Sequence, residues 1–503
     1  MIPPFKILFY LGATSALHAS VQAQAPAALE FQLFGPGRGL ELSIDAALQI
    51  AESSDIGLQL EDVNLEVARF DAAGSWGNFD WMFAAGGQLA DGEQKGSSTL
   101  TGADVLKFES QTYDFSFTRA LETGGSFVAA FDTNIVSTNN MFSNLPASST
   151  DNLRLSYSQP LLRGFGADYG TSVQNEAAVS YRRQREHRRE VLQALLKDVH
   201  DAYWDLVLAG EQLGVAASSL DLGLEQLERN QRMLTAGVGT EVEVIQAEAE
   251  VAQRMEALLR AEVALRAAED ALKGLIFPGR DSATWNTELI PITPLPVEAS
   301  TEVAPWEQLL ELALVKRPEL RQQRFEIQAA VLRHERTVSE RRMGLDLDLS
   351  VNSQSFSGNE GQAAKEALAF DFPTYTAGLK FSAPINNRSA RFLEKAARAR
   401  VRAAYLTYDQ LETRIVGEVR EAVRQVRYQA EAVSAAQTSL EATRRQLAAE
   451  EARYQNDLST NFQLLEFQQR LAEALNTEKS ARAGHAKALY ALQVAQGTAG
   501  EVY

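Results

Sequence analysis

Three carboxylates stand at two short breaks between long helical patterns. Glu241 and Glu243 follow the first break, and Asp457 lies within the second. A carboxylate in the first turn of a helix is stabilised by the helix dipole, which is one interpretation of these residues. The other is that several copies of the chain surround an opening, where these acids would form a negative ring that binds cations and acts as a gate.

The histidines are not spaced like metal ligands. Four of them follow residue 25, namely His187, His200, His334 and His485, and no two form an H-x3-H pair. Each falls on a helical position that looks exposed, so we expect solvated or inter-helix roles and no metal site.

A glycine-rich loop, Gly164–Gly170, lies between a strand pattern and a helix pattern. Its spacing is G-x-G-x-x-x-G, and a dinucleotide loop needs a parallel βαβ unit, whereas the strands expected here are antiparallel. The glycines are therefore expected to let the chain turn from a strand into a helix. Because the sequence also shows no Ser-His-Asp set, nucleophile elbow or phosphate loop, we predict no enzyme and no cofactor.

The chain repeats itself at a fixed distance. Val199–Ala202 corresponds to Val419–Ala422, and Val238-Gly239-Thr240 corresponds to Leu458-Ser459-Thr460, both at an offset of 220 (419 − 199 and 458 − 238). Each match lies in or beside a long helical pattern, so the unit that is duplicated is a long helical hairpin.

Apolar residues at helical spacing predict three helices in each half. The first half has helices over 42–70, 172–236 and 241–276, and the second has them over 306–336, 389–456 and 461–496. Ser43 is the expected N-cap of the first helix. Since the long helices of roughly 65 residues span about 100 Å and the others about 50 Å, two short helices can stack end to end beside one long helix.

Alternating apolar residues predict antiparallel strands between the first two helices of each half. The strands of the first half fall at 79–89, 113–117 and 153–157, and those of the second half at 345–351 and 375–381, with loops such as Ser353–Gly361 between them. The first half is about 42 residues longer here, and a further hairpin over 126–136 would account for the surplus. Four or six strands per chain remain open, and either number leaves sheet edges that need partner chains.

Composition limits the class of protein. Residues 1–25 read as a secretory signal with a cleavage site at Ala23-Gln24-Ala25. The chain has no cysteine and a net charge of −18, so it cannot use disulfides and does not suit nucleic acid as a partner.

Three passages together resemble the TolC-like outer-membrane efflux protein family. They are Leu42–Leu58, the strand-to-helix junction Ser158–Gly166, and the helix tip Ala236–Val244. The resemblance implies an α+β membrane protein in the outer membrane of a Gram-negative type envelope. Duplicated long α-helical hairpins of a homotrimer would form a periplasmic barrel, topped by an antiparallel transmembrane β-barrel of twelve strands shared by the trimer. It further implies contacts with outer-membrane lipid, a periplasmic adaptor protein and an inner-membrane pump of RND or ABC type.

The resemblance assigns roles to particular residues. The aspartates that form the family's acidic ring fall on Leu465 and Gln468 here, so that ring is not carried over. Glu241, Glu243 and Asp457 remain the candidates for a periplasmic gate. Adaptor docking is expected at the tips Gly237, Val238, Gly239, Thr240, Leu458, Ser459 and Thr460. Strand-to-helix junctions are expected at Pro160, Gly164, Gly166 and Pro384. Trp76, Phe79, Trp81 and Phe83 form either an interfacial aromatic girdle or ordinary packing at the strand base.

The expected organisation is a signal peptide over 1–25, a first repeat over 26–276, a linker over 277–305, a second repeat over 306–497 and a tail over 498–503. The expected function is a passive exit duct of a tripartite efflux or type I secretion system. The alternative is a secreted trimeric coiled-coil adhesin or surface scaffold, which would share the signal, the acidity and the long helices.

Overall fold

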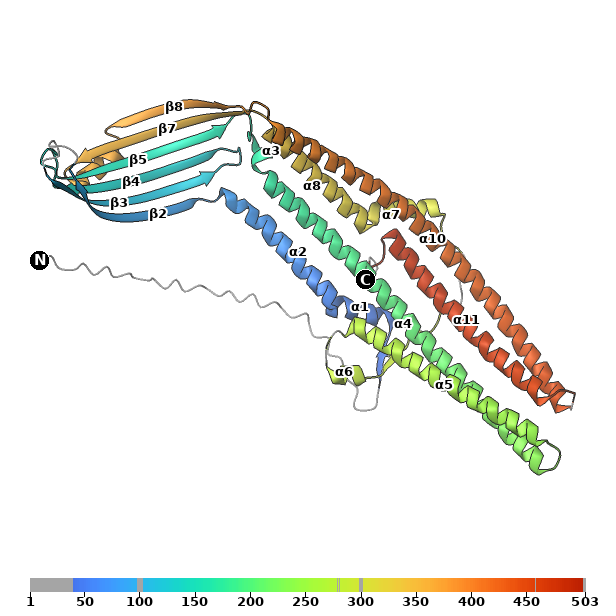
Figure 1. Ribbon diagram of the computed structural model, residues 1–503. Helices are drawn as coiled ribbons and strands as arrows, with labels where there is room; N and C mark the ends of the chain where they lie inside the picture. Colours follow the sequence, from blue (N-terminus) through green and yellow to red (C-terminus); the bar gives the residue numbers. More distant parts are fainter. Residues whose placement is uncertain are drawn as a thin grey trace, which may run out of the picture.

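The computed structural model describes residues 39–96, 103–277, 279, 281–297, 302–456 and 458–500. The predicted signal peptide and Asp457 lie outside these ranges. The described chain is elongated, with one β-sheet at one end and helices that run away from it to two hairpin tips (Figure 1). None of the helices in the described ranges is long and apolar enough to cross a membrane.

Each predicted first helix is broken once. The first forms α1 (Ile44–Ser54) and α2 (Ile56–Gly74), and its counterpart forms α7 (Trp306–Lys316) and α8 (Pro318–Glu340). The expected N-cap is present, because Ser43 Oγ accepts a hydrogen bond from Ala46 N at 3.2 Å. The first helix breaks at Asp55, whose carboxylate caps α2. Its counterpart breaks at Arg317, because Pro318 disfavours helical geometry in the residue before it.

The long helices and their return helices have the expected bounds to within a residue. They are α4 (Ser172–Thr235) with α5 (Glu241–Ile276), and α10 (Arg388–Gln455) with α11 (Asn461–Gln496). In Figure 1, α2 lies beside the upper part of α4 and α5 beside its lower part, so the predicted end-to-end stacking of short helices is confirmed. Close to the sheet the helices form one layer in the order α2, α4, α8, α10, and α11 packs the second hairpin against α4.

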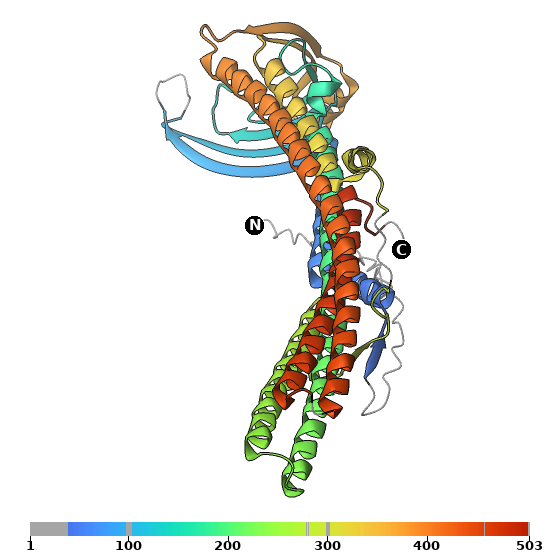
Figure 2. The ribbon, with the colours of Figure 1, turned by 90° about the vertical axis from the view of Figure 1, so that its right-hand side faces the viewer.

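The sheet has six antiparallel strands in the order β2-β3-β4-β5-β7-β8. They are β2 (Met82–Lys95), β3 (Val105–Ala120), β4 (Ser126–Thr138), β5 (Ala147–Pro160), β7 (Gly344–Ser357) and β8 (Pro373–Ser382). The further hairpin expected over 126–136 is therefore present as part of the sheet, and the four strands per chain implied by the resemblance are wrong for this protein. Figure 2 shows that the sheet is curved.

Several short elements complete the chain. They are β1 (Leu40–Leu42), η1 (Ser75–Phe79), α3 (Ala167–Gly170), α6 (Ser282–Asn286), β6 (Leu289–Pro291) and α9 (Glu360–Ala369). The predicted loop Ser353–Gly361 is wrong, since β7 runs to Ser357 and α9 begins at Glu360. The linker contains β6, which pairs in parallel with β1.

The main core surrounds Tyr203, which is fully buried where α4 meets β1 and the linker. Its hydroxyl donates to Leu42 O and accepts from Thr293 N, each at 3.0 Å. The prediction that the histidines are exposed is wrong for His200 and His485, whose exposed fractions are 8% and 2%. His200 accepts a hydrogen bond from the Trp204 indole and stacks on the Tyr490 ring, because α11 covers this face of α4. The expectation of an inter-helix role is thus met at His200.

Candidate functional site

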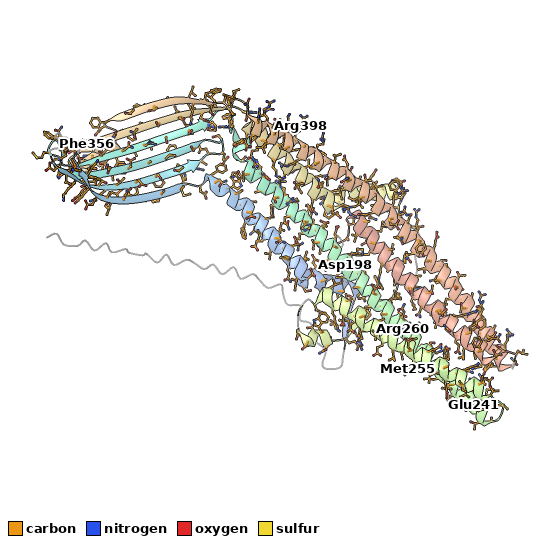
Figure 3. The ribbon with its side chains drawn as sticks, viewed as in Figure 1. Asp198, Glu241, Met255, Arg260, Phe356 and Arg398 are labelled. Carbon is orange, nitrogen blue, oxygen red and sulfur yellow. The ribbon has the colours of Figure 1, made fainter. Side chains whose placement is uncertain are left out.

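The two hairpin tips lie farthest from the sheet, and Figure 3 shows Glu241 at the end of the first. In this tip Gly237 has φ +75°, which favours glycine, and the amides of Val238 and Gly239 both donate to Met233 O at 3.0 Å. Gly239 is required for space instead, because a Cβ there would lie 2.9 Å from Leu234 N. The two glycines therefore serve the reversal for different reasons.

Both return helices begin with the same reciprocal cap. Thr240 Oγ1 accepts from Glu243 N at 3.3 Å, while Glu243 Oε2 accepts from Thr240 N at 2.9 Å. Thr460 and Gln463 form the equivalent pair at the second tip. A threonine followed three residues later by Glu or Gln is the signature of this cap, and it could have been found in the sequence. Glu243 is therefore held in a structural contact, whereas Glu241 is exposed.

The second tip makes its turn without glycine. Leu458 N donates to Arg453 O at 2.9 Å, and the Arg453 guanidinium donates back to Leu458 O at 3.3 Å. Ser459 Oγ donates to the buried Glu450 carboxylate, which also pairs with Arg453 at 3.2 Å. The same backbone hydrogen bond therefore closes both turns, and the second turn adds contacts from the Arg453, Ser459 and Glu450 side chains.

Large apolar side chains project from both tips. Val238 and Leu458, which correspond in the repeat, have exposed fractions of 73% and 68%. Val242 and Phe462, which correspond in the same way, are also exposed. Exposed apolar groups of this size, gathered at the tips of two hairpins, are typical of a surface that a partner covers.

Above the tips a buried polar network links the two hairpins. Gln226 of α4 donates to Asn461 Oδ1 at 2.8 Å and to the Tyr454 hydroxyl at 3.1 Å, both in the second hairpin. It also contacts Asn230 Oδ1 at 2.9 Å, and Asn230 in turn donates to Glu243 O. These links involve side chains that sequence periodicity alone presents as ordinary polar helix residues.

A second link is made by Arg254 of α5, whose exposed fraction is only 5%. Its guanidinium pairs with Glu250 at 2.8 Å, donates to Ser219 O at 2.8 Å and reaches Gln468 of α11 at 3.3 Å. Gly223 of α4 leaves room for it, since a Cβ there would lie 3.0 Å from Arg254 Cδ.

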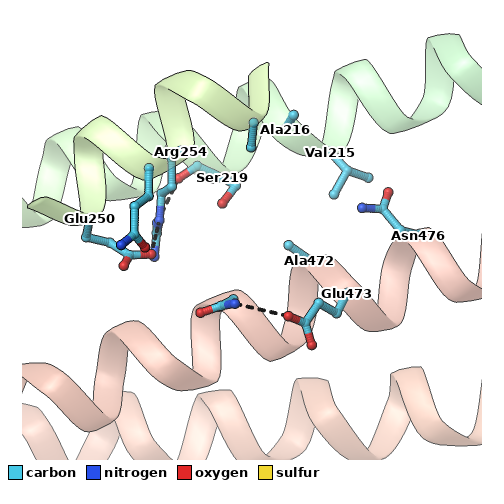
Figure 4. A pocket seen from close by; sticks show the side chains of 11 residues that line it. Val215, Ala216, Ser219, Glu250, Arg254, Ala472, Glu473 and Asn476 are labelled. Carbon is cyan, nitrogen blue, oxygen red and sulfur yellow. Dashed lines mark hydrogen bonds and ion pairs between the residues drawn. The ribbon is translucent and has the colours of Figure 1, made fainter. Parts of the chain in front are cut away.

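The resemblance places an aspartate at Gln468. In this structure Gln468 Oε1 accepts a hydrogen bond from the buried Arg254 guanidinium, which already pairs with Glu250. The other such position, Leu465, is buried. A groove of about 180 Å³ opens beside Arg254 between the hairpins (Figure 4). Its walls include Val215, Ser219, Glu250, Ala472, Glu473 and Asn476.

At the opposite end, the strand-to-helix junction is tightly packed. Pro160 ends β5, and Gly164 and Gly166 have φ +82° and +101°. Gly164 N donates to the Ser339 hydroxyl at 3.1 Å, and a Cβ at Gly124 would lie 2.0 Å from Gly164 O. Pro384 lies between the end of β8 and the start of α10. These residues do not adjoin the tips, so the structure divides the predicted site residues between two ends of the molecule.

Two long segments of the chain match a known protein family. Residues 130–276 and 309–498 match the family described as "Outer membrane efflux protein". The chain belongs to this family, which is the TolC-like family of outer-membrane efflux channels. It is a channel of the outer membrane with its helical body in the periplasm, and not an enzyme.

Solved structures of such channels share the fold. The OprN outer-membrane channel has a TM-score of 0.67 at 16% identity, covering 90% of both chains. The CmeC channel of Campylobacter jejuni has 0.65 at 14%, covering 90% of this chain and 85% of that one. The MtrE channel of Neisseria gonorrhoeae has 0.64 at 19%, covering 90% and 88%. No curated protein sequence matches the chain.

Proposed function

We propose that this protein is the passive exit duct of a tripartite efflux or type I secretion system, built as a homotrimer. The observation that carries the proposal is that the two outermost helices and the two edge strands of the chain can each pair with another copy. The layer of helices ends in α2 on one side and α10 on the other, and the sheet ends in β2 and β8 on the same sides. The family assignment leaves no support for the adhesin alternative.

The exposed face of α2 carries a heptad stripe. Its large apolar residues are spaced alternately by four and three, and all are more than half exposed: Ile56, Leu60, Val63, Val67 and Phe70. Such a stripe is a coiled-coil seam without a partner in this chain. The two carboxylates that flank it, at the g and e positions, are Glu66 and Asp71.

The upper part of α10 carries a seam of the same spacing and the opposite charge. Its members are Phe392, Ala396, Ala399, Ala403 and Leu406, and the flanking g and e positions hold Lys395, Arg402 and Arg400. Figure 3 places Arg398 on this upper part of α10. Because α2 runs towards the sheet and α10 away from it, the two seams would meet antiparallel. The large residues of α2 would then face small alanines, and g positions would pair acid with base.

In the half of the sheet nearer the helices, one face is apolar and the other is polar, as expected of a pore wall. Farther from the helices the first face also carries charged residues, such as Glu93 and Glu109. Strand register puts Phe115, Phe117, Leu349, Leu379 and Phe381 on one face. The other face carries Asp114, Ser116, Asp132, Asn152 and Asp348. We assign the first face to lipid and the second to the water-filled lumen of a β-barrel shared by the copies.

The aromatic residues at the base of the sheet fit the edge of that lipid-facing band. Trp81 is half exposed, packs edge-on against Phe127 at 5.8 Å and lies under the Arg119 guanidinium. Phe83, also half exposed, contacts Phe117 at 4.9 Å. Exposed aromatics at one height are typical of a girdle where the membrane meets water.

At the other end, the exposed Val238, Val242, Leu458 and Phe462 form the docking surface for a periplasmic adaptor. An inner-membrane pump, of RND or ABC type, would deliver the cargo through that adaptor. The links from Gln226 and Arg254 to the second hairpin would hold the tips closed, and the exposed Glu241 would line the mouth. No covalent chemistry is assigned to any of these residues.

Channel formation by the purified protein in planar bilayers tests this function. Wild type should purify as a trimer and give discrete conductance steps. The double variant Leu60→Glu and Val67→Glu should remain monomeric and give none, because each substitution puts a charge into the seam. Val315→Glu is the matched control, since Val315 of α7 is equally exposed but lies outside the seam. Conducting trimers in the seam variant, or no conductance in wild type, would refute the proposal.

A further inference from the structure

The sheet contributes six strands per chain, and this number determines the width of the exit. We infer that three copies pool eighteen strands, and that this protein has a wide outer pore suited to bulky hydrophilic cargo. The inference rests on the proposed trimeric duct. It concerns the size class of the cargo, which neither the family nor the fold specifies.

The width follows from strand geometry. Strands about 4.8 Å apart and tilted by about 40° each take roughly 6 Å of circumference, so eighteen make a backbone cylinder about 36 Å in diameter. Twelve strands would make one of about 24 Å. Side chains take about 5 Å from each wall, which leaves openings of roughly 26 Å and 14 Å.

The helical layer is wide enough to join a barrel of this width. Beside the sheet, each chain presents the four helices α2, α4, α8 and α10 side by side. Twelve helices spaced by about 8–10 Å form a ring about 96–120 Å around, which matches the circumference of roughly 110 Å for eighteen strands.

Most side chains on the lumen-facing side of the sheet are short, and the long ones include Phe108, Arg154 and Phe356. Short residues occur on this face in strands β2, β3, β5, β7 and β8. Examples are Ala84, Gly86, Ser116, Ser156, Ser350 and Thr376. Gly86 is small because the Asp114 carboxylate lies over it, where a Cβ would meet Asp114 Oδ1 at 2.5 Å.

The helix α9 at the far end of the sheet does not enter the lumen. Glu366 of α9 accepts a hydrogen bond from Ser355 Oγ at 2.6 Å. In the register Ser355 lies on the face of Val351 and Leu349, which is the face assigned to lipid. Ala363 and Ala367 of α9 are fully buried, since the helix packs on β5 and β7. The helix is therefore a covering on the outside of the wall.

Size-graded labelling tests the width directly. The chain has no cysteine, so Ser350→Cys introduces a single thiol on the polar face near mid-height. We would add maleimide-polyethylene glycols of increasing diameter to the outer side of the trimer in vesicles. The thiol should react with reagents up to about 20–25 Å across, and the rate should fall more than tenfold above that size. Leu349→Cys, on the neighbouring lipid-facing position, should resist every hydrophilic reagent and is the control.

The outcomes separate the two proposals. A cut-off near 14 Å, in trimers that conduct, would overturn the wide exit and leave the duct intact. Failure to form conducting trimers would refute the duct itself. Labelling at Leu349→Cys with exclusion at Ser350→Cys would overturn the assignment of the two sheet faces and the inference with it.

Discussion

Replacement of Gln226 by leucine tests whether the hairpin links control the duct. Gln226 is buried and makes two hydrogen bonds across the hairpin interface, to Tyr454 and Asn461. Each neutral hydrogen bond contributes about 1 kcal/mol net, so the substitution removes about 2 kcal/mol from the closed arrangement of one chain. If both bonds break when the tips open, the closed-to-open ratio per chain falls roughly 30-fold.

The assay is the open probability of single trimers in planar bilayers, measured together with the midpoint of thermal unfolding. Gln226→Leu should open far more often than wild type. The matched control is Gln231→Leu, because Gln231 lies on the same helix with an exposed side chain outside the network. The reasoning is refuted if Gln226→Leu lowers thermal stability but opens no more often than Gln231→Leu. That result would mean that the network stabilises the fold in both states and does not select the closed one.

Four further outcomes are expected. Gly239→Val should abolish export in cells while trimers still form, since a Cβ at this position meets Leu234 N; normal export would contradict the docking role of the tip. Lys273→Met should lower stability by about 1.5–3 kcal/mol in a denaturant titration, because it removes one of the two cations that lie 2.9 Å from the buried Glu269 carboxylate. Burial opposes ionisation of Glu269, but hydrogen bonds from Lys273, Leu289 N and Arg266 outweigh it and lower its pKa, so its contribution is complete above about pH 4.3 and is lost as the pH falls through the lowered pKa. Thermal melts of wild type and Glu269→Gln should therefore converge in acid, and a constant difference would argue against this linkage. Glu66→Lys should weaken the trimer in analytical ultracentrifugation, and adding Lys395→Glu should restore it; no rescue would argue against the α2–α10 seam.

Local signals were enough to predict most of the helical part. The bounds of α5 and α11 follow from residues that are neighbours in the chain, because helical spacing and the caps at Thr240 and Thr460 depend on a few consecutive side chains. The repeat at an offset of 220 also predicted that the two hairpins correspond. What periodicity did not show were the breaks at Asp55 and Arg317, although a proline at position 318 marks the second.

The candidate site was predicted in its position but not in its contacts. The tips fall where the glycine and threonine pattern placed them, and Glu243 turned out to be half of a cap. Nothing in the spacing of Gln226, Asn461 or Arg254 distinguishes them from solvated helix residues. They become buried links only because α11 packs across α4 and α5.

Sequence by itself determined the elements, their order and their duplication, because helix caps, turns and the alternation of strands are set by interactions between near neighbours. The tertiary structure decided how many strands join one sheet, which histidines are buried and which polar side chains join the hairpins. The buried histidines, the hairpin links and the pairing of β5 with β7 depend on residues more than a hundred positions apart that meet only when the halves pack. Assembly of several copies follows the same rule. The heptad stripes on α2 and α10 can be read from the sequence, but only the fold leaves both helices at the outer edges of the layer, where another copy can pack.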